Sequence, residues 1–296
     1  MDIRVLEYYL IVAREESITK AAAILHVTQP TLSRQLMQLE EELQVKLFNR
    51  TSHSVVLTED GLLFKRRAQE IVALSEKTKR DFIRGNRELS GEIGIGCGEF
   101  RSIQIIAQIM KEFKKEHPFV TFQIYSGNSS NIKERIESGI LDIGVILDYV
   151  DIRKYEYVRI PLSEEWGVLV REDSPLAAME YVTPEDIREL PLIISERSMR
   201  DNELADWIGK KYEDLNIVST YNLMYNAAIM VANGMGVAGT IKLDCRYEGT
   251  RFVPARPSVK NNSVFAWKKA LSQSQAVSSF IEFSRIYIKR ISSNTT

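Results

Sequence analysis

The sequence is poor in cysteine and histidine, and it lacks a long apolar run. Its two cysteines, Cys97 and Cys245, are too few for a disulfide framework and are typical of a reducing compartment. The three histidines, His26, His53 and His117, do not have ligand spacing, so no metal site and no cofactor are expected. The absence of about 18 consecutive apolar residues argues against a membrane-spanning helix. The first residues lead into an amphipathic helix rather than a signal peptide, and we therefore expect a cytoplasmic protein.

A strongly basic domain is also missing. Residues 1–88 contain 14 lysines and arginines against 13 acidic residues, and residues 89–296 contain 25 against 27. Composition alone therefore does not indicate a nucleic-acid partner. A modest basic patch can still bind DNA when an assembly presents two or four copies of it, so any DNA binding is expected to depend on oligomerisation. The length of 296 residues, with 44% hydrophobic content, allows more than one domain.

The most informative stretch is residues 21–36, which predicts two short helices joined by a tight turn. Ser17 or Thr19 can cap the first helix, and Thr28 can cap the second, where Pro30 is tolerated in the first turn. An inward stripe of the second helix is predicted from the spacing of Leu32, Leu36, Leu39 and Leu43. Its other face can hydrogen-bond base edges and phosphates through Gln29, Thr31, Arg34, Gln35 and Gln38. The pattern indicates a DNA-binding helix-turn-helix, or alternatively an amphipathic helix pair in an ordinary core.

A predicted hairpin and a long helix follow. Two β-prone runs, 47–51 and 55–58, flank the polar residues 52–54 in the manner of a wing. Thr58 then begins a helix with an acidic first turn. We expect its apolar edge to have nothing in its own domain to bury against, which favours a dimerisation role. That heptad-like edge consists of Phe64, Ala68, Ile71, Ser75, Thr78 and Phe82.

With these elements in place, residues 1 to about 88 resemble the N-terminal half of LysR-type transcriptional regulators. The matching segments are Ser17 to Ala22, Leu25 to Pro30, Leu32-Ser33, Leu39 to Leu43, Leu47 to Arg50 and Leu57 to Gly61. The resemblance implies a winged helix-turn-helix DNA-binding domain over residues 1–58, a linker helix over 59–88 and an effector-binding domain over 89–296. The candidate DNA-binding residues are Thr28, Gln29, Pro30, Thr31, Ser33, Arg34, Gln35, Arg50 and His53.

Two details qualify this DNA-binding surface. Members of the family often carry further basic residues in the wing, whereas here the wing contact depends on Arg50 and His53. The acidic run Glu40-Glu41-Glu42 is expected to face away from the DNA. The predicted surface is therefore formed mainly by the second helix.

Residues 89–296 alternate strand-like and helix-like segments, which predicts an α/β domain with a mostly parallel sheet. A glycine-ended strand over 92–98 leads into a helix to about Glu116, and the pattern repeats through the strands 120–125 and 140–147. Further strands are expected at 166–170, 192–194, 236–238 and 263–267.

The resemblance implies two subdomains like those of periplasmic solute-binding proteins, with the effector cleft between them. Subdomain I is expected over about 91–162 and 267–296, and subdomain II over about 163–266. Ligands in open α/β sheets bind beyond the carboxyl ends of strands, near helix N-termini. The candidate effector-binding residues at these ends are Arg101, Ser102, Asn128, Ser129, Leu147, Ser195 and Asn226.

The chemistry of two of these residues suggests the charge of the effector. A cation in the first turn of a helix opposes the macrodipole, so Arg101 indicates a nearby carboxylate, from either a ligand or the protein. Ser129 supplies a hydroxyl at another helix start, although it could also be a plain N-cap. We therefore expect a small anion or zwitterion. Asn222, Tyr225 and Asn226 could line the far wall, and Tyr225 is equally compatible with the core.

Two other classes of function account for less of the chain. A solute receptor without DNA binding accounts for residues 91–296 but leaves residues 17–58 without a purpose. The segment Gly94 to Glu99 superficially resembles a dinucleotide fingerprint, but Glu99 stands where glycine or alanine is needed and would repel a pyrophosphate. No phosphate-binding loop or nucleophile elbow is present, so the chain is not expected to be an enzyme.

The sequence therefore predicts a transcriptional regulator that binds double-stranded promoter DNA and a small-molecule effector. The resemblance implies a homotetramer built as a dimer of dimers, and RNA polymerase is a further candidate partner. Cys97 follows a strand at the mouth of the expected cleft, where it is either a redox sensor or an inert core thiol; the inert thiol is the favoured interpretation.

Overall fold

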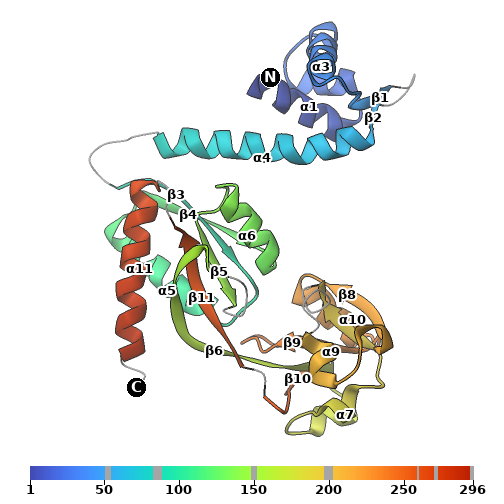
Figure 1. The fold of residues 1–296 in the computed structure, drawn as a ribbon, viewed down its shortest axis with the longest axis vertical. Coiled ribbons are helices and arrows are strands. Elements are labelled where there is room, and N and C mark those ends of the chain that lie inside the picture. Colours follow the sequence, from blue (N-terminus) through green and yellow to red (C-terminus); the bar gives the residue numbers. More distant parts are fainter. Residues whose placement is uncertain are drawn as a thin grey trace. The chain divides into compact units, whose positions relative to one another are not determined.

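The computed structural model describes residues 1–50, 55–82, 89–147, 152–196, 203–258, 260–269 and 273–293. They belong to two compact units, Met1–Arg84 and Gly85–Thr296 (Figure 1). Each unit has its own hydrophobic core, so each is described by itself. Among the described helices, none is both long enough and apolar enough to span a bilayer.

The N-terminal unit contains the predicted helix pair, the hairpin and the long helix. Ser17 caps the second helix by accepting from the Lys20 amide at 3.4 Å, as expected. Thr28 occupies the N-cap of the third helix, but its hydroxyl bonds the Thr31 hydroxyl at 2.8 Å instead of capping the backbone. The elements are α1 (Ile3–Glu15), α2 (Ile18–Ile24), α3 (Gln29–Leu43), the antiparallel pair β1 (Phe48–Arg50) and β2 (Val55–Leu57), and α4 (Glu59–Phe82).

The three residues of the acidic run at the end of α3 differ in burial. The Glu40 side chain is buried, with 3% of the residue exposed, whereas Glu41 and Glu42 are exposed. The Glu40 carboxylate accepts from the amides of Leu47 at 2.8 Å and Phe48 at 3.1 Å. These two amides lie where the chain turns from α3 into β1, and buried N–H groups need an acceptor. Glu40 is therefore a structural residue of the winged unit.

One edge of α4 packs within its own unit, which corrects part of the predicted seam. The Phe64 ring lies edge-on to Tyr9 with 4.9 Å between centroids, and Ala68 is fully buried in the same core. The Tyr9 hydroxyl donates to the Gly61 carbonyl at 2.6 Å, and burial raises the pKa of Tyr9. The expectation that this edge has nothing in its own domain to bury against is therefore wrong. Among the described side chains of α4, the large apolar ones that are exposed are Leu62, Leu63, Ile71 and Leu74.

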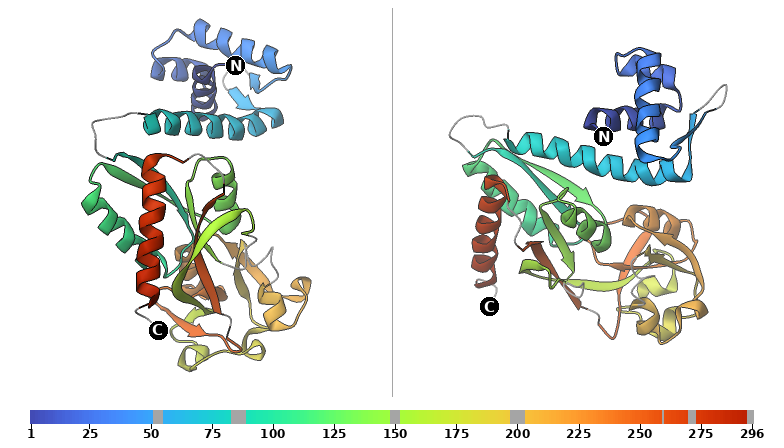
Figure 2. Two further views of the ribbon diagram at one scale, coloured as in Figure 1. Left: turned by 60° about the vertical axis from the view of Figure 1, so that its left-hand side comes forward. Right: turned by 45° about the horizontal axis from the view of Figure 1, so that its top comes forward.

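The larger unit consists of two halves, each with its own layer of sheet (Figures 1 and 2). In the first half the strand order is β4-β3-β5-β11-β6, and two parallel pairs join β3 to its neighbours. Apolar side chains of α5 and α11 pack into its core with those of β3 and β11. The bounds are β3 (Gly91–Cys97), α5 (Ile103–Glu116), β4 (Val120–Ser126), α6 (Ser129–Glu137), β5 (Ile143–Leu147), β6 (Tyr155–Arg171), β11 (Lys260–Lys268) and α11 (Gln275–Ser293).

The second half continues the strand order as β6-β9-β7-β8, with β10 on the other edge of β6. Its core lies between the sheet and the short helices of this half. The bounds are a 3-10 turn (Pro175–Ala178), α7 (Pro184–Ile187), β7 (Leu192–Ser195), α9 (Glu203–Ile208), a second 3-10 turn (Tyr212–Asp214), β8 (Ile217–Tyr221), α10 (Met224–Ala232), β9 (Val237–Ile241) and β10 (Thr250–Pro254).

Two crossing strands join the halves and make the sheet mixed instead of mostly parallel. The 17-residue strand β6 pairs antiparallel with β11 up to Glu165 and with β9 from Trp166 onward. The first crossing thus lies close to the expected position at Leu162-Ser163. The return crossing precedes Lys260, because Trp267 pairs with Ile143 deep in the first half, so the expected position near Trp267 is wrong.

Replacement of Glu40 should destabilise the N-terminal unit selectively. Glu40→Ala leaves the amides of Leu47 and Phe48 buried without an acceptor, which costs about 2 to 3 kcal/mol. All three tryptophans, Trp166, Trp207 and Trp267, lie in the larger unit. Urea unfolding of the full chain should therefore show an earlier far-UV circular dichroism transition and an unshifted tryptophan fluorescence transition.

The exposed neighbour provides the control for this substitution. Glu41→Ala should change stability by less than about 0.5 kcal/mol, because its side chain is at the surface. Equal effects of Glu40→Ala and Glu41→Ala would contradict the structural role of Glu40.

Candidate effector pocket and recognition helix

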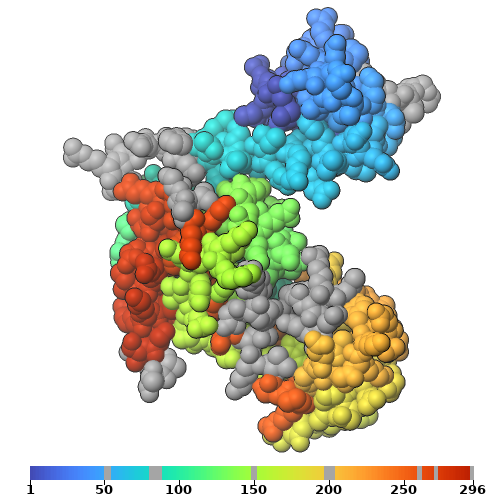
Figure 3. Space-filling model, in the orientation of Figure 1, coloured from blue at the N-terminus to red at the C-terminus, as the bar shows by residue number. Residues whose placement is uncertain are grey.

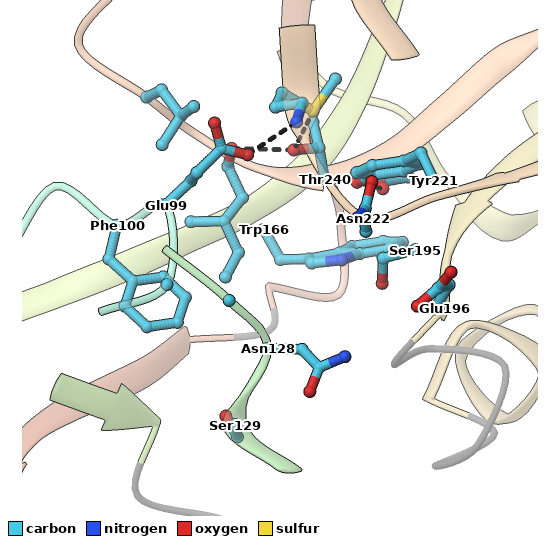
Figure 4. Close-up of a pocket in the computed structure, with 16 residues that line it drawn as sticks. Glu99, Phe100, Asn128, Ser129, Trp166, Ser195, Glu196, Tyr221, Asn222 and Thr240 are labelled. Carbon is cyan, nitrogen blue, oxygen red and sulfur yellow. Dashed lines mark hydrogen bonds between the residues drawn. The ribbon is translucent and has the colours of Figure 1, made fainter. Parts of the chain in front are cut away.

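A pocket lies between the two halves of the larger unit (Figure 4). It encloses about 700 Å³ when the open solvent at its mouth is included. The first half contributes the loop after β3 and the start of α6, and the second contributes Trp166 of β6 and the ends of β7, β8 and β9. The labelled side chains in Figure 4 come from both halves, so a molecule bound there would touch both.

The structure brings some of the predicted effector residues together at this pocket. Asn128, Ser129 and Ser195 line it, and so does Asn222 on the far wall. Asn128 is the N-cap of α6 and accepts from the Asn131 amide at 2.9 Å, so the capping role that the sequence allows for Ser129 belongs to its neighbour. The ends of several strands thus contribute side chains to the pocket.

Other predicted effector residues do not line the pocket. Leu147 and Ser102 are completely buried, and Asn226 is exposed on α10 away from the lining. Tyr225 is also exposed, with 62% of its surface accessible, so it is not a core residue. Leu147 ends the fully buried strand β5, and Asn226 lies in the first turn of α10, whose successive side chains point in different directions.

Arg101 is held by the protein's own carboxylate. Its Nε donates to Asp244 Oδ1 at 2.9 Å, and the neighbouring Gln104 amide donates to Asp244 Oδ2 at 2.7 Å. Helix α5 begins after Arg101, at Ile103, with Ser102 as N-cap. The sequence left open whether the carboxylate near Arg101 belongs to a ligand or to the protein. In the structure it belongs to the protein, as Asp244. This ion pair links α5 in the first half to the segment after β9 in the second.

The N-terminus of α5 is occupied by Glu164, a residue that the sequence reasoning missed. Glu164 is almost completely buried, with 1% exposure. Its carboxylate accepts from the amides of Arg101 at 3.2 Å and Ser102 at 3.0 Å. The Ser102 side chain makes no capping bond, so Glu164 supplies the acceptor that the helix start needs. In the sequence, the one sign of this role is that Glu164 and Glu165 form an acidic pair inside a long β-prone segment.

The N-terminus of α10 is occupied in the same way by Glu99. Its N-cap residue, Leu223, has no side-chain acceptor, and the Met224 amide instead donates to Glu99 Oε2 at 2.6 Å. Glu99 belongs to the first half and Met224 to the second, so this bond also crosses the cleft. Glu99, which argued against a dinucleotide fingerprint, therefore caps α10 from a distant part of the chain.

The pocket lining carries negative charge. Glu99 and Glu196 both line it, and among the described lining residues none is lysine, arginine or histidine. The described part of the chain also holds no group of three or more residues suited to a metal ion. Residue Asp148 and residues 197–202 lie outside the described residues.

Cys97 is a core thiol. It donates to the Gly98 carbonyl at 2.9 Å, and burial together with the nearby Glu164 carboxylate raises its pKa from 9.0 to about 12. The thiolate, which is the reactive form, is therefore disfavoured. Cys245 is exposed.

In the N-terminal unit, the start of α3 is open to solvent, and Figure 3 shows α3 at the surface of the unit in that view. Ser33 and Gln35 are half-buried. The side chain of Arg50 and all of His53 lie outside the described residues, as does the side chain of Phe82. The predicted DNA-binding residues that are exposed are Thr28, Gln29, Pro30, Thr31 and Arg34.

The two units define a class of protein: a transcriptional regulator that joins a helix-turn-helix to a ligand-binding domain. Residues 3–62 match the family model of the bacterial regulatory helix-turn-helix protein, lysR family, and residues 86–287 match the LysR substrate binding domain. The chain belongs to the LysR family of transcriptional regulators. It binds DNA and an effector, and it is not an enzyme. The match over residues 3–62 overturns the alternative of a receptor without DNA binding.

Individual relatives and solved structures agree with this assignment. The chain is 36% identical to the transcriptional regulator BsdA of Bacillus subtilis, over 73% of this chain and 74% of that one. It is 29% identical to the uncharacterised regulator YwqM of Bacillus subtilis, over 96% and 99% of the two chains. The LysR-family regulator CbnR has the same fold, with a TM-score of 0.75 at 20% identity over 97% and 99% of the chains.

The two cysteines should differ in reactivity. At about pH 8, iodoacetamide should label Cys245 in the folded protein and leave Cys97 unmodified, because a pKa raised to about 12 keeps the buried thiol protonated. Mass spectrometry of the native and urea-unfolded chain measures this. Cys245→Ser should abolish native labelling, and rapid labelling of Cys97 in the folded chain would revive the redox-sensor hypothesis.

Proposed function

We propose that the protein regulates promoters in the cytoplasm by inserting the start of α3 into the major groove. The observation that supports this proposal most strongly is the solvent exposure of Gln29, Thr31 and Arg34 on a helix whose other face is buried. An amide, a hydroxyl and a guanidinium can distinguish base edges, and Arg34 is suited to a guanine. In support, CbnR, which shares this fold, has been solved in complex with its target DNA.

The proposed assembly begins with pairing of the linker helices. The exposed apolar side chains of α4, which include Leu63, Ile71 and Leu74, are the surface that pairing would bury. The wing lacks extra basic residues, so two or more copies of the recognition helix are needed for tight binding. Contacts between effector domains would then join two dimers into a tetramer, with RNA polymerase as a candidate partner on the DNA.

The proposed control acts through the pocket between the two halves. A ligand that touches both halves binds one arrangement of them more tightly than another, and only this difference in affinity can shift the population. Since every subunit of the assembly carries one effector domain, a shift in their arrangement would change the spacing of the recognition helices. Effector binding and DNA binding are then linked without any direct contact.

Base reading is tested by substitutions in α3. Arg34→Ala should weaken binding to the DNA upstream of the protein's own gene by about 1 to 3 kcal/mol, because a bidentate contact to guanine is lost. Fluorescence anisotropy with cognate and scrambled DNA measures the change. Equal weakening on both DNAs would make Arg34 a phosphate contact.

The matched control removes a positive charge elsewhere in the unit. Arg14→Ala on α1 should leave sequence discrimination unchanged, because Arg14 is outside the recognition helix and pairs with Glu15. If the double variant Gln29→Ala with Arg34→Ala binds as tightly as the parent protein, the placement of α3 in the groove is wrong.

Assembly is tested by placing charge on the exposed edge of α4. Ile71→Glu with Leu74→Glu should reduce the mass measured by light scattering, because each buried carboxylate without a partner is costly. DNA affinity should fall with it through the loss of bivalency. Gln69→Glu, exposed on another face of the helix, is the control. An unchanged mass in the double variant would rule out this edge as the dimer contact.

A further inference from the structure

Arg101 and the starts of α5 and α10, which could have favoured an anionic effector, are already bonded to carboxylates of the protein. The two amides at the start of α5 donate to Glu164, the first amide of α10 donates to Glu99, and the Arg101 guanidinium donates to Asp244. An anion gains little from a helix N-terminus whose amides already have a carboxylate. Of the features that favoured a negative ligand, Ser129 at the start of α6 is the one that still lines the pocket.

The charges of the described lining residues point to the opposite sign. Glu99 and Glu196 line the pocket, and none of the described lining residues is lysine, arginine or histidine. Figure 4 shows these two carboxylates at opposite ends of the pocket, with Trp166 and Asn222 between them. An anion placed there would meet two like charges, whereas a cation would be attracted at either end.

The walls between the two carboxylates are suited to a cation with an apolar body. Trp166 and Tyr221 are largely buried, at 7% and 9% exposure, and both line the pocket. The Tyr221 hydroxyl already donates to the Gly239 carbonyl at 2.7 Å, which leaves its ring as the surface that faces a ligand. Aromatic faces attract ammonium groups and also contact methylene chains. Asn128 and Asn222 add side-chain carbonyls that can accept from an ammonium.

We propose that the effector is an organic ammonium ion, and that a linear aliphatic diamine is the form that engages both Glu99 and Glu196. The inference depends on the proposed function, since it assigns a chemical class to the ligand of the same pocket. The pocket itself and the match to a substrate-binding domain point to a ligand, and the two carboxylates determine its charge.

The position of Glu99 also provides a route from binding to regulation. The same carboxylate caps α10 in the other half through the Met224 amide. An ammonium group at Glu99 would therefore bind next to one of the bonds that cross the cleft. Its binding energy would differ between open and closed arrangements of the two halves, which is the requirement for a population shift.

Isothermal titration of the full-length protein at low salt tests the charge of the ligand. The probes are 1,4-diaminobutane, n-butylamine, 1,4-butanediol and succinate, which share a four-carbon chain and differ in charge. We expect the diamine to bind most tightly, the monoamine more weakly, and the diol and succinate not at all. Tighter binding of succinate than of the diamine, or no binding of either amine, overturns the proposal.

Matched substitutions test the location of the site. Glu99→Gln and Glu196→Gln should each weaken diamine binding by about tenfold, the effect of one charge-assisted hydrogen bond. The Glu99→Gln variant keeps a side-chain acceptor for the Met224 amide, and Glu196→Gln leaves that cap untouched. Glu180→Gln, an exposed position outside the pocket, should have no effect. Equal diamine affinity in all three variants overturns the assignment.

DNA binding measured in parallel separates this proposal from the general function. If the wild-type protein binds its promoter DNA and ignores every amine, the ligand class is wrong and the regulator proposal stands. If it binds the diamine but no promoter DNA, the proposed recognition of DNA fails while the pocket assignment survives.

Discussion

Burial of the Glu164 carboxylate is the constraint on which the geometry of the effector domain depends. The residue lies on β6 beside the point where that strand leaves β11 and joins β9. An ionised carboxylate cannot be buried at acceptable cost unless donors satisfy it, and the amides of Arg101 and Ser102 are those donors. The start of α5 and the crossing strand are therefore held together, and the loop that forms one wall of the pocket is held with them.

The other bonds that cross the cleft differ from this one in exposure. The Arg101 and Asp244 side chains are 27% and 38% exposed, and the bond from the Met224 amide to Glu99 is partly buried. Exposed ion pairs contribute little to stability because water competes for both partners. The buried bond therefore holds the start of α5 against β6, and the more exposed ion pair contributes less to the way the two halves are held together.

The features predicted correctly from the sequence depend on neighbours within a few residues. The Ser17 cap, the α3 stripe and the strand-helix alternation are local patterns. The partners of the acidic residues are not local: 63 residues separate Arg101 from Glu164, and 125 separate Glu99 from Met224. Even Glu40 reaches across the turn between α3 and β1, 7 residues away. Nothing in a single sequence distinguishes these carboxylates from solvated ones, so the α3 surface was predictable and the filled helix ends were not.

The same distinction explains why the proposed charge of the ligand differs from the one expected from the sequence. A count of helix N-termini around a cleft gives the number of sites where an anion could bind, but each site is available only if no carboxylate of the chain reaches it. Here α5 and α10 are both satisfied internally. The described lining offers a ligand the Glu99 and Glu196 carboxylates, the Trp166 and Tyr221 rings, and the Asn128 and Ser129 side chains at the start of α6. The carboxylates that cap α5 and α10 from a distance thus decide which helix ends remain open to a ligand.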